Sequence, residues 1–302
     1  MTLERTEKRG RKRRFGGKAT AAFIMLPPAL ILFTLFVIWP LLNAGYYSFF
    51  DWNGYGSPEK FVGVSNYQRT FQHGIFWVSV KNTMIVLLVS LLIQMPIALA
   101  LALAIYKKTP TNALFRLVFF LPFILAEVAA GLIWSFAFDG DTGLVANITH
   151  ALGWEQFFIL ADRHYAFYAI CTVVVWKYFG FHMMIYIAAL QAVPGELIEA
   201  ARIEGAKHWA VIRHVQIPFI RPAIVVSGFF AVIGSLQLFD IIIPLTNGGP
   251  SNLTHTVVSY LYTFGLTRLN IGYGSAVGVI LFVTAVAAAT LYQWQLNKAA
   301  AR

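Results

Sequence analysis

Six apolar stretches divide this chain of 302 residues, and each is long enough to cross a lipid bilayer. A helix needs roughly 20 residues to span the hydrocarbon core, and backbone groups in lipid must be hydrogen-bonded within the segment. We therefore expect an all-α polytopic membrane protein with six transmembrane helices. The predicted spans are residues 21–43, 82–106, 114–138, 164–190, 220–243 and 272–295.

The composition indicates that lipid is part of the solvent. Hydrophobic residues make up 58% of the chain and charged residues only 12%, whereas a soluble domain carries about 25% charged residues. The net charge is +10, but eight of the 23 Lys and Arg lie within residues 1–18. A basic run before an apolar span is typical of a cytoplasmic anchor that can meet anionic lipid heads, so it does not indicate nucleic-acid binding. The single cysteine, Cys171, excludes an intrachain disulfide.

The distribution of Lys and Arg predicts the orientation. The connections and ends on one side of the predicted spans hold 17 of these residues and those on the other side hold five. Because positive residues stay on the cytoplasmic side, we expect both termini there. The chain then divides into a basic cytoplasmic segment (1–20), a transmembrane domain (21–295) and a cytoplasmic tail (296–302).

The cytoplasmic connection between the fourth and fifth spans, residues 191–219, is longer than a link between adjacent helices requires. Pro194 suits the first turn of a helix, and the Glu and Ala residues after it favour a helix. Gly205 then permits a sharp turn, a second short helix is expected over residues 206–214, and Pro218 marks the entry to the fifth span. The pattern predicts a helix–turn–helix elbow that projects from the membrane towards a partner.

The elbow also carries a motif of fixed spacing: Glu-Ala-Ala, three residues, Gly, nine residues, then apolar-x-apolar-Pro. This motif resembles the signature loop of importer permeases of the ATP-binding-cassette (ABC) class, with Val and Ile where Ile and Leu are commoner at the end. The resemblance implies that the motif contacts an ATPase subunit. Its residues are Glu199, Ala200, Ala201, Gly205, Val215, Ile217 and Pro218.

The resemblance extends over nearly the whole chain. Residues 26–28 and 39–40 look like the opening of carbohydrate-type permeases, and residues 61–67 look like their first outside loop. Leu-Thr-Asn-Gly-Gly-Pro, residues 245–250, is similar to a motif of one permease type in maltose and glycerol-phosphate importers. Taken alone, this motif predicts a tight turn.

This resemblance implies a division of roles between several polypeptides. No Gly-x-x-x-x-Gly-Lys-Ser/Thr motif occurs, so we expect no cofactor and no catalytic residue in this chain. ATP and Mg²⁺ would bind two cytoplasmic ATP-binding subunits, a second homologous permease would complete the pore, and an extracellular or periplasmic solute-binding protein would deliver the substrate. The expected function is import of a sugar across a bacterial or archaeal cytoplasmic (inner) membrane, with a polyol or glycerol phosphate as the alternative.

Two charged residues, Glu127 and Lys177, lie near the middle of the third and fourth predicted spans. Charges inside a bilayer are costly unless they are paired or face water. The sequence leaves three interpretations open: the two residues form a structural pair, each faces the solute cavity separately, or the span limits need to be moved.

Polar and aromatic side chains in the third to fifth spans are the further candidates for the solute pathway, because sugar sites combine hydrogen-bonding groups with aromatic faces. The alternative is that they anchor helices at the interface or pack between them. The candidates are Ser235, Gln237, Asp240, Trp134, Trp176 and Tyr178. The histidines show no metal-ligand spacing, and no metal site is expected.

A secondary transporter driven by protons or ions is the main alternative to an ABC permease. Such carriers use buried carboxylates, and Glu127 and Asp240 fit that requirement, but this class does not account for the elbow. An intramembrane enzyme has less support, since neither Gly-x-Ser-x-Gly nor His-Glu-x-x-His occurs.

Overall fold

The computed structural model describes residues 16–300. Over this range the chain is helical apart from its connections and one isolated β-bridge between Phe50 and Phe61. The all-α class predicted from the apolar stretches is confirmed.

The long helices of the described range form continuous stretches or a bent pair. The first stretch is α1 (Gly16–Phe33), η1 (Thr34–Ile38) and α2 (Trp39–Tyr47), and the second is α4 (Gly74–Val89), η2 (Ser90–Gln94) and α5 (Met95–Ile105). The bent pair is α6 (Pro110–Ile124) and α7 (Glu127–Ala137), followed by α9 (Ala166–Gln191). The last two stretches are α11 (His208–Val211), η3 (Ile212–Gln216) and α12 (Ile217–Gln237), then α15 (Ile271–Ala300).

Shorter helices lie in the connections. They are α3 (Ser65–Gln72), α8 (Leu144–Ala151), α10 (Gly195–Ile203), α13 (Ile242–Thr246), α14 (Val257–Leu261) and η4 (Tyr262–Leu266).

Between residues 16 and 300, five helices are long and apolar enough to cross a bilayer, and the number is six if the bent pair is one span. Each coincides with a predicted apolar stretch, but two helices begin earlier than predicted. The second starts at Gly74 instead of residue 82, and the fifth at His208 instead of residue 220. The apolar residues mark only the part of a helix that suits lipid. The helical backbone itself continues into the more polar residues that precede this part.

The third predicted span, residues 114–138, is wrong as a single straight helix. It breaks at Leu125 and Ala126, whose ψ angles of 142° and 141° are extended, and α6 and α7 meet at 97°. Pro122 weakens the last turn of α6 because it has no N–H to donate to the preceding turn. The break creates two helix ends between the long helices, and their open backbone groups require partners there.

Of the four π-helical turns in the described chain, three lie just before a proline. The turns η1, η2 and η3 each end two residues before a proline, which is Pro40, Pro96 or Pro218. In an α-helix a proline clashes with the carbonyl four residues earlier, which here belongs to the middle residue of each π turn. The wider turn relieves that clash, so each helix continues through its proline.

The helix α9 is the most enclosed of the five long helices. Half (50%) of the residues in its apolar 18-residue segment are buried, against 0% in the corresponding segment of the first helical stretch. Its first half packs with the region of α13 in a cluster around Ile170 and Ile241. Its second half packs with α5 and α12 around Met183, Ala98 and Ile220. α9 is therefore the element against which the other spans are positioned.

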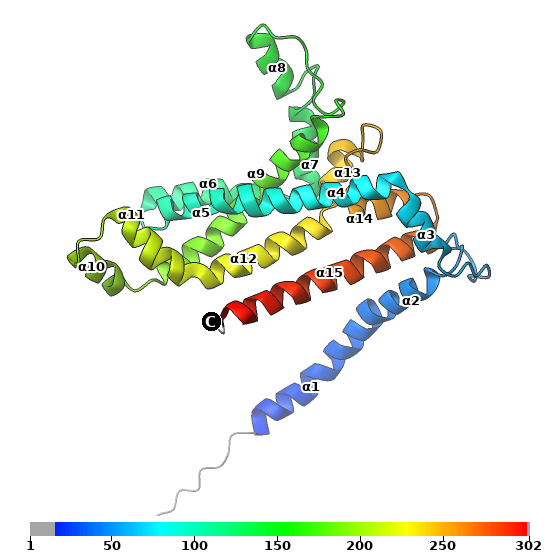
Figure 1. Cartoon of the computed structure of the whole chain (residues 1–302), viewed down its shortest axis with the longest axis horizontal. Coiled ribbons are helices and arrows are strands. Elements are labelled where there is room, and N and C mark those ends of the chain that lie inside the picture. Colours follow the sequence, from blue (N-terminus) through cyan, green and yellow to red (C-terminus); the bar gives the residue numbers. More distant parts are fainter. Residues whose placement is uncertain (1–15, 301–302) are drawn as a thin grey trace, which may run out of the picture.

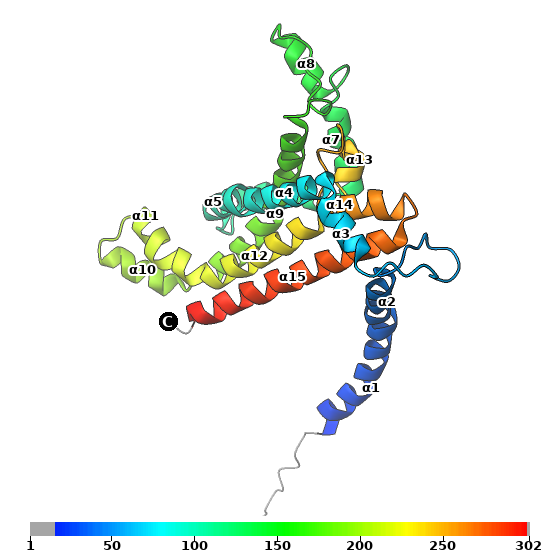
Figure 2. The ribbon, with the colours of Figure 1, turned by 45° about the vertical axis from the view of Figure 1, so that its right-hand side comes forward.

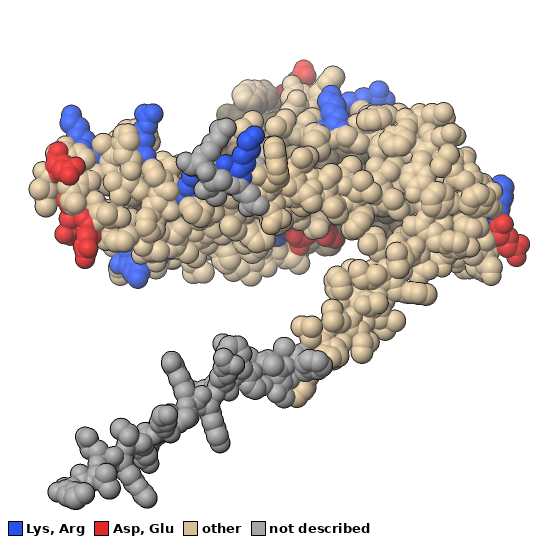
Figure 3. Space-filling view, turned by 60° about the horizontal axis from the view of Figure 1, so that its bottom comes forward, with Lys and Arg blue, Asp and Glu red and all other residues tan. Residues whose placement is uncertain are grey.

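Figures 1 and 2 show the elbow helices α10 and α11 at one end of the bundle and α3 near the other. The first stretch diverges from the bundle: α2 contacts α15, while α1 points away. In Figure 3 the charged side chains gather near the ends and along one rim, and most of the surface between them is uncharged. An uncharged surface of this kind suits contact with lipid.

Candidate functional site

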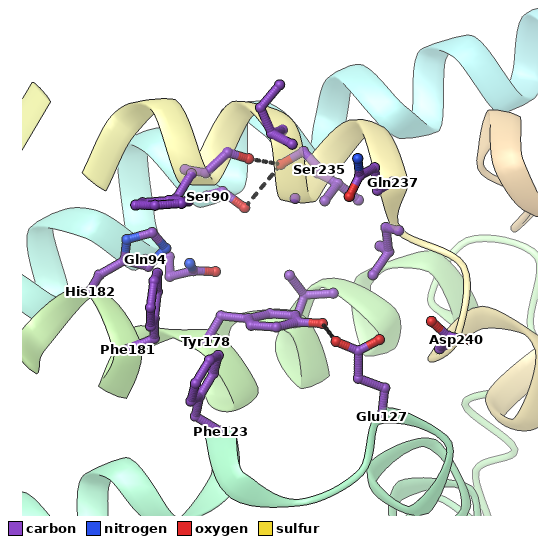
Figure 4. A pocket seen from close by; sticks show the side chains of 17 residues that line it. Ser90, Gln94, Phe123, Glu127, Tyr178, Phe181, His182, Ser235, Gln237 and Asp240 are labelled. Carbon is purple, nitrogen blue, oxygen red and sulfur yellow. Dashed lines mark hydrogen bonds between the residues drawn. The ribbon is translucent and has the colours of Figure 1, made fainter. Parts of the chain in front are cut away.

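A cavity of about 310 Å³ lies between four elements: η2, the junction of α6 with α7, α9 and the end of α12 (Figure 4). Both polar and aromatic side chains line it. The polar ones are Ser90, Gln94, Glu127, Tyr178, His182, Ser235, Gln237 and Asp240, and the aromatic rings besides Tyr178 are Phe123, Phe181 and Phe230.

A lysine stabilises the break that forms one wall of this cavity. Lys177 on α9 is only 1% exposed. Its Nζ donates hydrogen bonds to the carbonyl oxygens of Leu125 at 2.6 Å, Pro122 at 3.3 Å and Phe123 at 3.4 Å. Carbonyls at the end of a helix have no partner within it, and a cation also suits the negative end of the helix dipole. Lys177 therefore caps α6, so its charge is used at the helix end.

Glu127 occupies the opposite kind of helix end. It is the first residue of α7, where free N–H groups favour a negative charge. Its Oε1 accepts a hydrogen bond from the Tyr178 hydroxyl at 2.7 Å, and its carboxylate faces the cavity (Figure 4). In the described part of the chain Glu127 and Lys177 form no ion pair. None of the three interpretations left open holds for both residues: the two charges do not pair, only Glu127 faces the cavity, and the third predicted span is broken between α6 and α7 where both charges find partners.

Asp240 lies in a second break. The fifth predicted span was expected to reach residue 243, but α12 ends at Gln237, where Leu238 turns to an extended ψ of 115°. The Thr256 hydroxyl donates to the Leu238 carbonyl oxygen at 2.6 Å and satisfies it. The segment after this break carries the Asp240 carboxylate to the same end of the cavity as Glu127 (Figure 4).

The opposite wall holds residues that the sequence analysis missed. Ser90 and Gln94 lie in η2, and Ser235 faces them from α12 with its Oγ 3.4 Å from the Ser90 Oγ. Gln94 is 2% exposed, and its Oε1 has no hydrogen-bond partner. Two polar residues four positions apart share one helix face, so their spacing in an apolar span was the signal that could have identified them.

Five of the eight predicted pathway residues line the cavity: Glu127, Tyr178, Ser235, Gln237 and Asp240.

Trp134, Trp176 and Lys177 do not line the cavity, so their prediction as pathway residues is not supported by the geometry. The Trp134 ring packs 5.4 Å from Trp176 and 4.9 Å from Phe138, against the cluster at the first half of α9. Successive helix residues are rotated by about 100°, which turns positions 176 and 177 away from Tyr178 and the cavity.

The elbow begins with α10, which projects at the end of the bundle (Figure 1). Its carbonyl end is closed by two backbone bonds: Gly205 N–H to Arg202 O at 3.0 Å and Ala206 N–H to Ala201 O at 2.9 Å. This pattern is a Schellman motif, which requires a left-handed residue at its turn. Gly205 supplies it with φ +84°, so the predicted stop at this glycine is observed.

The motif side chains of α10 are accessible. Glu199 and Ala200 are exposed and Ala201 is half-buried. Two large apolar side chains beside them, Ile203 and Trp209, are 87% and 68% exposed. Apolar exposure of this extent marks a surface that suits a partner.

The second predicted piece of the elbow, residues 206–214, is not a separate helix. From His208 to Gln237 the chain forms one helix of 30 residues through α11, η3 and α12. Val215, Ile217 and Pro218 of the motif lie inside it, because the π turn at η3 accommodates the proline. The elbow is therefore joined directly to the helix that carries Ser235 and Gln237.

The predicted turn at residues 245–250 is also observed. Asn247 and Gly248 have left-handed φ angles of 47° and 81°. A Cβ on Gly248 would lie 2.0 Å from the His255 ring, so this position has no room for a larger residue. Asn82 of α4 holds the following segment by donating to the carbonyl oxygens of Leu253 at 2.7 Å and His255 at 2.9 Å.

Residues 94–300 match the family described as "Binding-protein-dependent transport system inner membrane component". This segment contains Gln94, both helix breaks and the elbow. The chain belongs to this family. It is therefore a multi-pass inner-membrane permease of an ABC importer, and the ion-coupled carrier considered above is no longer needed to explain Glu127 and Asp240.

Relatives of this permease match over nearly their whole length. "Sulfoquinovosyl glycerol transport system permease protein SmoG" of Agrobacterium fabrum is 32% identical, over 91% of this chain and 90% of that protein. "Diacetylchitobiose uptake system permease protein NgcF" of Streptomyces coelicolor is also 32% identical, over 90% of this chain and 80% of that protein.

The fold is also found in a solved structure. A bacterial ABC transporter involved in the import of the acidic polysaccharide alginate has a chain with a TM-score of 0.82 and 23% identity, covering 93% of this permease and 96% of that chain. At this identity the likeness concerns the fold alone.

Proposed function

We propose that this permease carries a sugar or a related polyol through the cavity at the two helix breaks, and that the elbow couples this transport to ATP hydrolysis on separate subunits. The two named relatives are permease proteins of a sulfoquinovosyl glycerol transport system and of a diacetylchitobiose uptake system, which supports a carbohydrate substrate. Hydrogen-bonding groups and aromatic faces occur together in the cavity, and this combination suits a polyhydroxylated solute.

The single observation that carries the proposal is the continuous helix from His208 to Gln237. At a rise of about 1.5 Å per residue, its 30 residues span about 45 Å. One end is at the elbow and the other end bears Ser235 and Gln237 in the cavity wall. A displacement of the elbow would be transmitted through a rigid rod to the solute site.

The exposed surfaces support a multi-subunit assembly. The proposed partners are two cytoplasmic ATP-binding subunits at the elbow, which would hold ATP and Mg²⁺, and a solute-binding protein at the opposite end. A second homologous permease would complete the pathway. The first helical stretch has no buried side chain in η1 or α2, which leaves its apolar surface available to such a permease or to lipid.

The coupling role is tested by charge changes in the elbow. Glu199→Lys and Gly205→Asp should each abolish ATP-driven solute uptake in cells while membrane insertion remains normal. Glu199 is exposed and makes no ion pair within the described chain, so loss of uptake in Glu199→Lys would not come from a broken internal ion pair. Normal uptake by both elbow variants would contradict coupling at this site.

The proposed orientation places the elbow in the cytoplasm. The only cysteine, Cys171, is buried, so a new surface cysteine can be labelled against a low background. With intact cells, a membrane-impermeant maleimide should label Thr142→Cys and should label Glu204→Cys only after permeabilisation. Both positions are exposed. Labelling of Glu204→Cys in intact cells would reverse the orientation.

A further inference from the structure

The charged groups that line the cavity are all acidic. Glu127 and Asp240 lie at one end of it, and none of the lining residues that the structure describes is Lys or Arg (Figure 4). His182, which also lines the cavity, pairs its Nδ1 with the Ser227 hydroxyl at 2.6 Å. A solute in this cavity therefore meets negative charge.

The nearest buried cation, Lys177, is directed at a helix end and does not line the cavity. Lys177 points its Nζ at the three carbonyl oxygens that end α6 and lines no part of the cavity. The Glu127 carboxylate has no lysine partner within the described chain. It lies at the amino-terminal end of α7, where free N–H groups favour a negative charge, and accepts a hydrogen bond from Tyr178.

Gln94 is a second, independent polar feature of this space. The side chain is 2% exposed, its Oε1 has no hydrogen-bond partner, and its amide points into the cavity from the wall opposite Glu127 (Figure 4). A buried acceptor without a donor is unfavourable, and few such groups occur in a folded protein. A hydroxyl or amine of a bound solute would satisfy it.

Aromatic faces also line the cavity. The Phe123 and Phe181 rings stack with centroids 4.8 Å apart, and the Tyr178 ring lies 6.3 Å from Phe123. Aromatic faces accept the apolar face of a sugar ring and attract cations through their negative quadrupole. The ring faces provide no interaction that compensates an anion for the loss of its hydration.

We propose that this cavity selects uncharged or amine-bearing glycosides and rejects anionic ones, with Glu127 and Asp240 as the residues that determine the selection. The inference rests on the proposed function, since it treats the cavity as the solute site. Such charge selectivity would distinguish this permease from a transporter of an acidic solute, such as the alginate importer. An anionic group of a solute placed beside the Glu127 and Asp240 carboxylates should reduce affinity on the order of 10–100-fold.

The experiment compares three sugars of the same ring and different charge: methyl glucoside, glucosamine at a pH that protonates its amine, and glucuronate. Their binding to the assembled complex in nanodiscs, without the solute-binding protein, is measured by saturation-transfer NMR. Omission of the binding protein is essential, because it has a selectivity of its own. The expected result is saturable binding of the first two sugars and at least tenfold weaker binding of glucuronate.

The variant is Glu127→Gln combined with Asp240→Asn, which keeps hydrogen-bonding capacity and removes both charges. The measured quantity is the dissociation constant of glucuronate divided by that of methyl glucoside. General damage to the fold would weaken the binding of both sugars alike and leave this ratio unchanged. The ratio should fall to within about threefold of unity in the variant.

Equal affinity for glucuronate and methyl glucoside in the unmodified complex would overturn the inference, and so would an unchanged ratio in the double variant. A complex that retains ATP-driven uptake but binds none of the three sugars would also overturn it, while leaving the coupling role intact. Absence of ATP-driven uptake in the unmodified complex would contradict the proposed function itself.

Discussion

Replacement of Lys177 by methionine should destabilise the protein, because Lys177 caps the end of α6 at the break. The substitution retains an unbranched apolar stem and removes the donor to three buried carbonyl oxygens. The bond to Leu125 O, at 2.6 Å, is charge-assisted and contributes about 1.5–3 kcal/mol. The two longer bonds, to Pro122 O and Phe123 O, together add about 1 kcal/mol.

Desolvation of the buried lysine works in the opposite direction, so the net loss of unfolding free energy should be about 1–3 kcal/mol. At about 2 °C per kcal/mol, the midpoint of thermal unfolding should fall by about 2–6 °C. The assay is fluorescence-monitored unfolding of the purified chain in detergent. Lys60→Met is the control: its Nζ pairs with Asp51 at the surface, with 72% of the Lys60 side chain exposed, and such a pair contributes about 0–1 kcal/mol.

Two results would refute this reasoning. One is a midpoint for Lys177→Met that equals the control. The other is recovery of stability when Glu127→Gln is added to Lys177→Met, because recovery would show that the two charges mainly stabilise each other. The structure instead predicts coupling between Tyr178→Phe and Glu127→Gln of about 1 kcal/mol in a double-mutant cycle, through the 2.7 Å hydrogen bond that joins these side chains.

Two glycines provide further predictions. A Cβ on Gly180 would lie 2.1 Å from the Phe119 carbonyl oxygen, so Gly180→Ala should separate α9 from α6 and reduce stability by about 1–3 kcal/mol; Gly45→Ala, with nothing within 4 Å, should leave the unfolding midpoint unchanged or slightly raised. Gly248→Ala should be at least as damaging, because its Cβ would meet the His255 ring and its φ is left-handed, and limited proteolysis of the turn should become faster. An unfolding midpoint like that of Gly45→Ala would contradict either prediction.

The apolar stretches predicted the type and the approximate positions of the long helices because burial in lipid requires both length and internal hydrogen bonding. The turn at Gly205 was predictable for a local reason, since glycine is the residue that closes a helix at positive φ. These features depend on neighbouring residues, so a single sequence contains the information.

The break in the third span could not be predicted from local sequence. Hydrophobic residues continue through Leu125 and Ala126, and the group that stabilises the break, Lys177, comes from a different helix. The same difficulty applies to Asp240, whose position depends on Thr256 capping the end of α12. Ser90 and Gln94 differ, because their spacing was visible in the sequence, although only the packed bundle shows that they face Ser235.

The measurement that tests the central claim most directly is solute accumulation in proteoliposomes that contain the assembled complex and its binding protein, with no ion gradient. Coupling through the elbow and the helix from His208 to Gln237 predicts that accumulation requires ATP on the elbow side and disappears in Glu199→Lys. Accumulation driven by an imposed proton or sodium gradient without ATP, or ATP-driven accumulation that Glu199→Lys leaves unchanged, would contradict it.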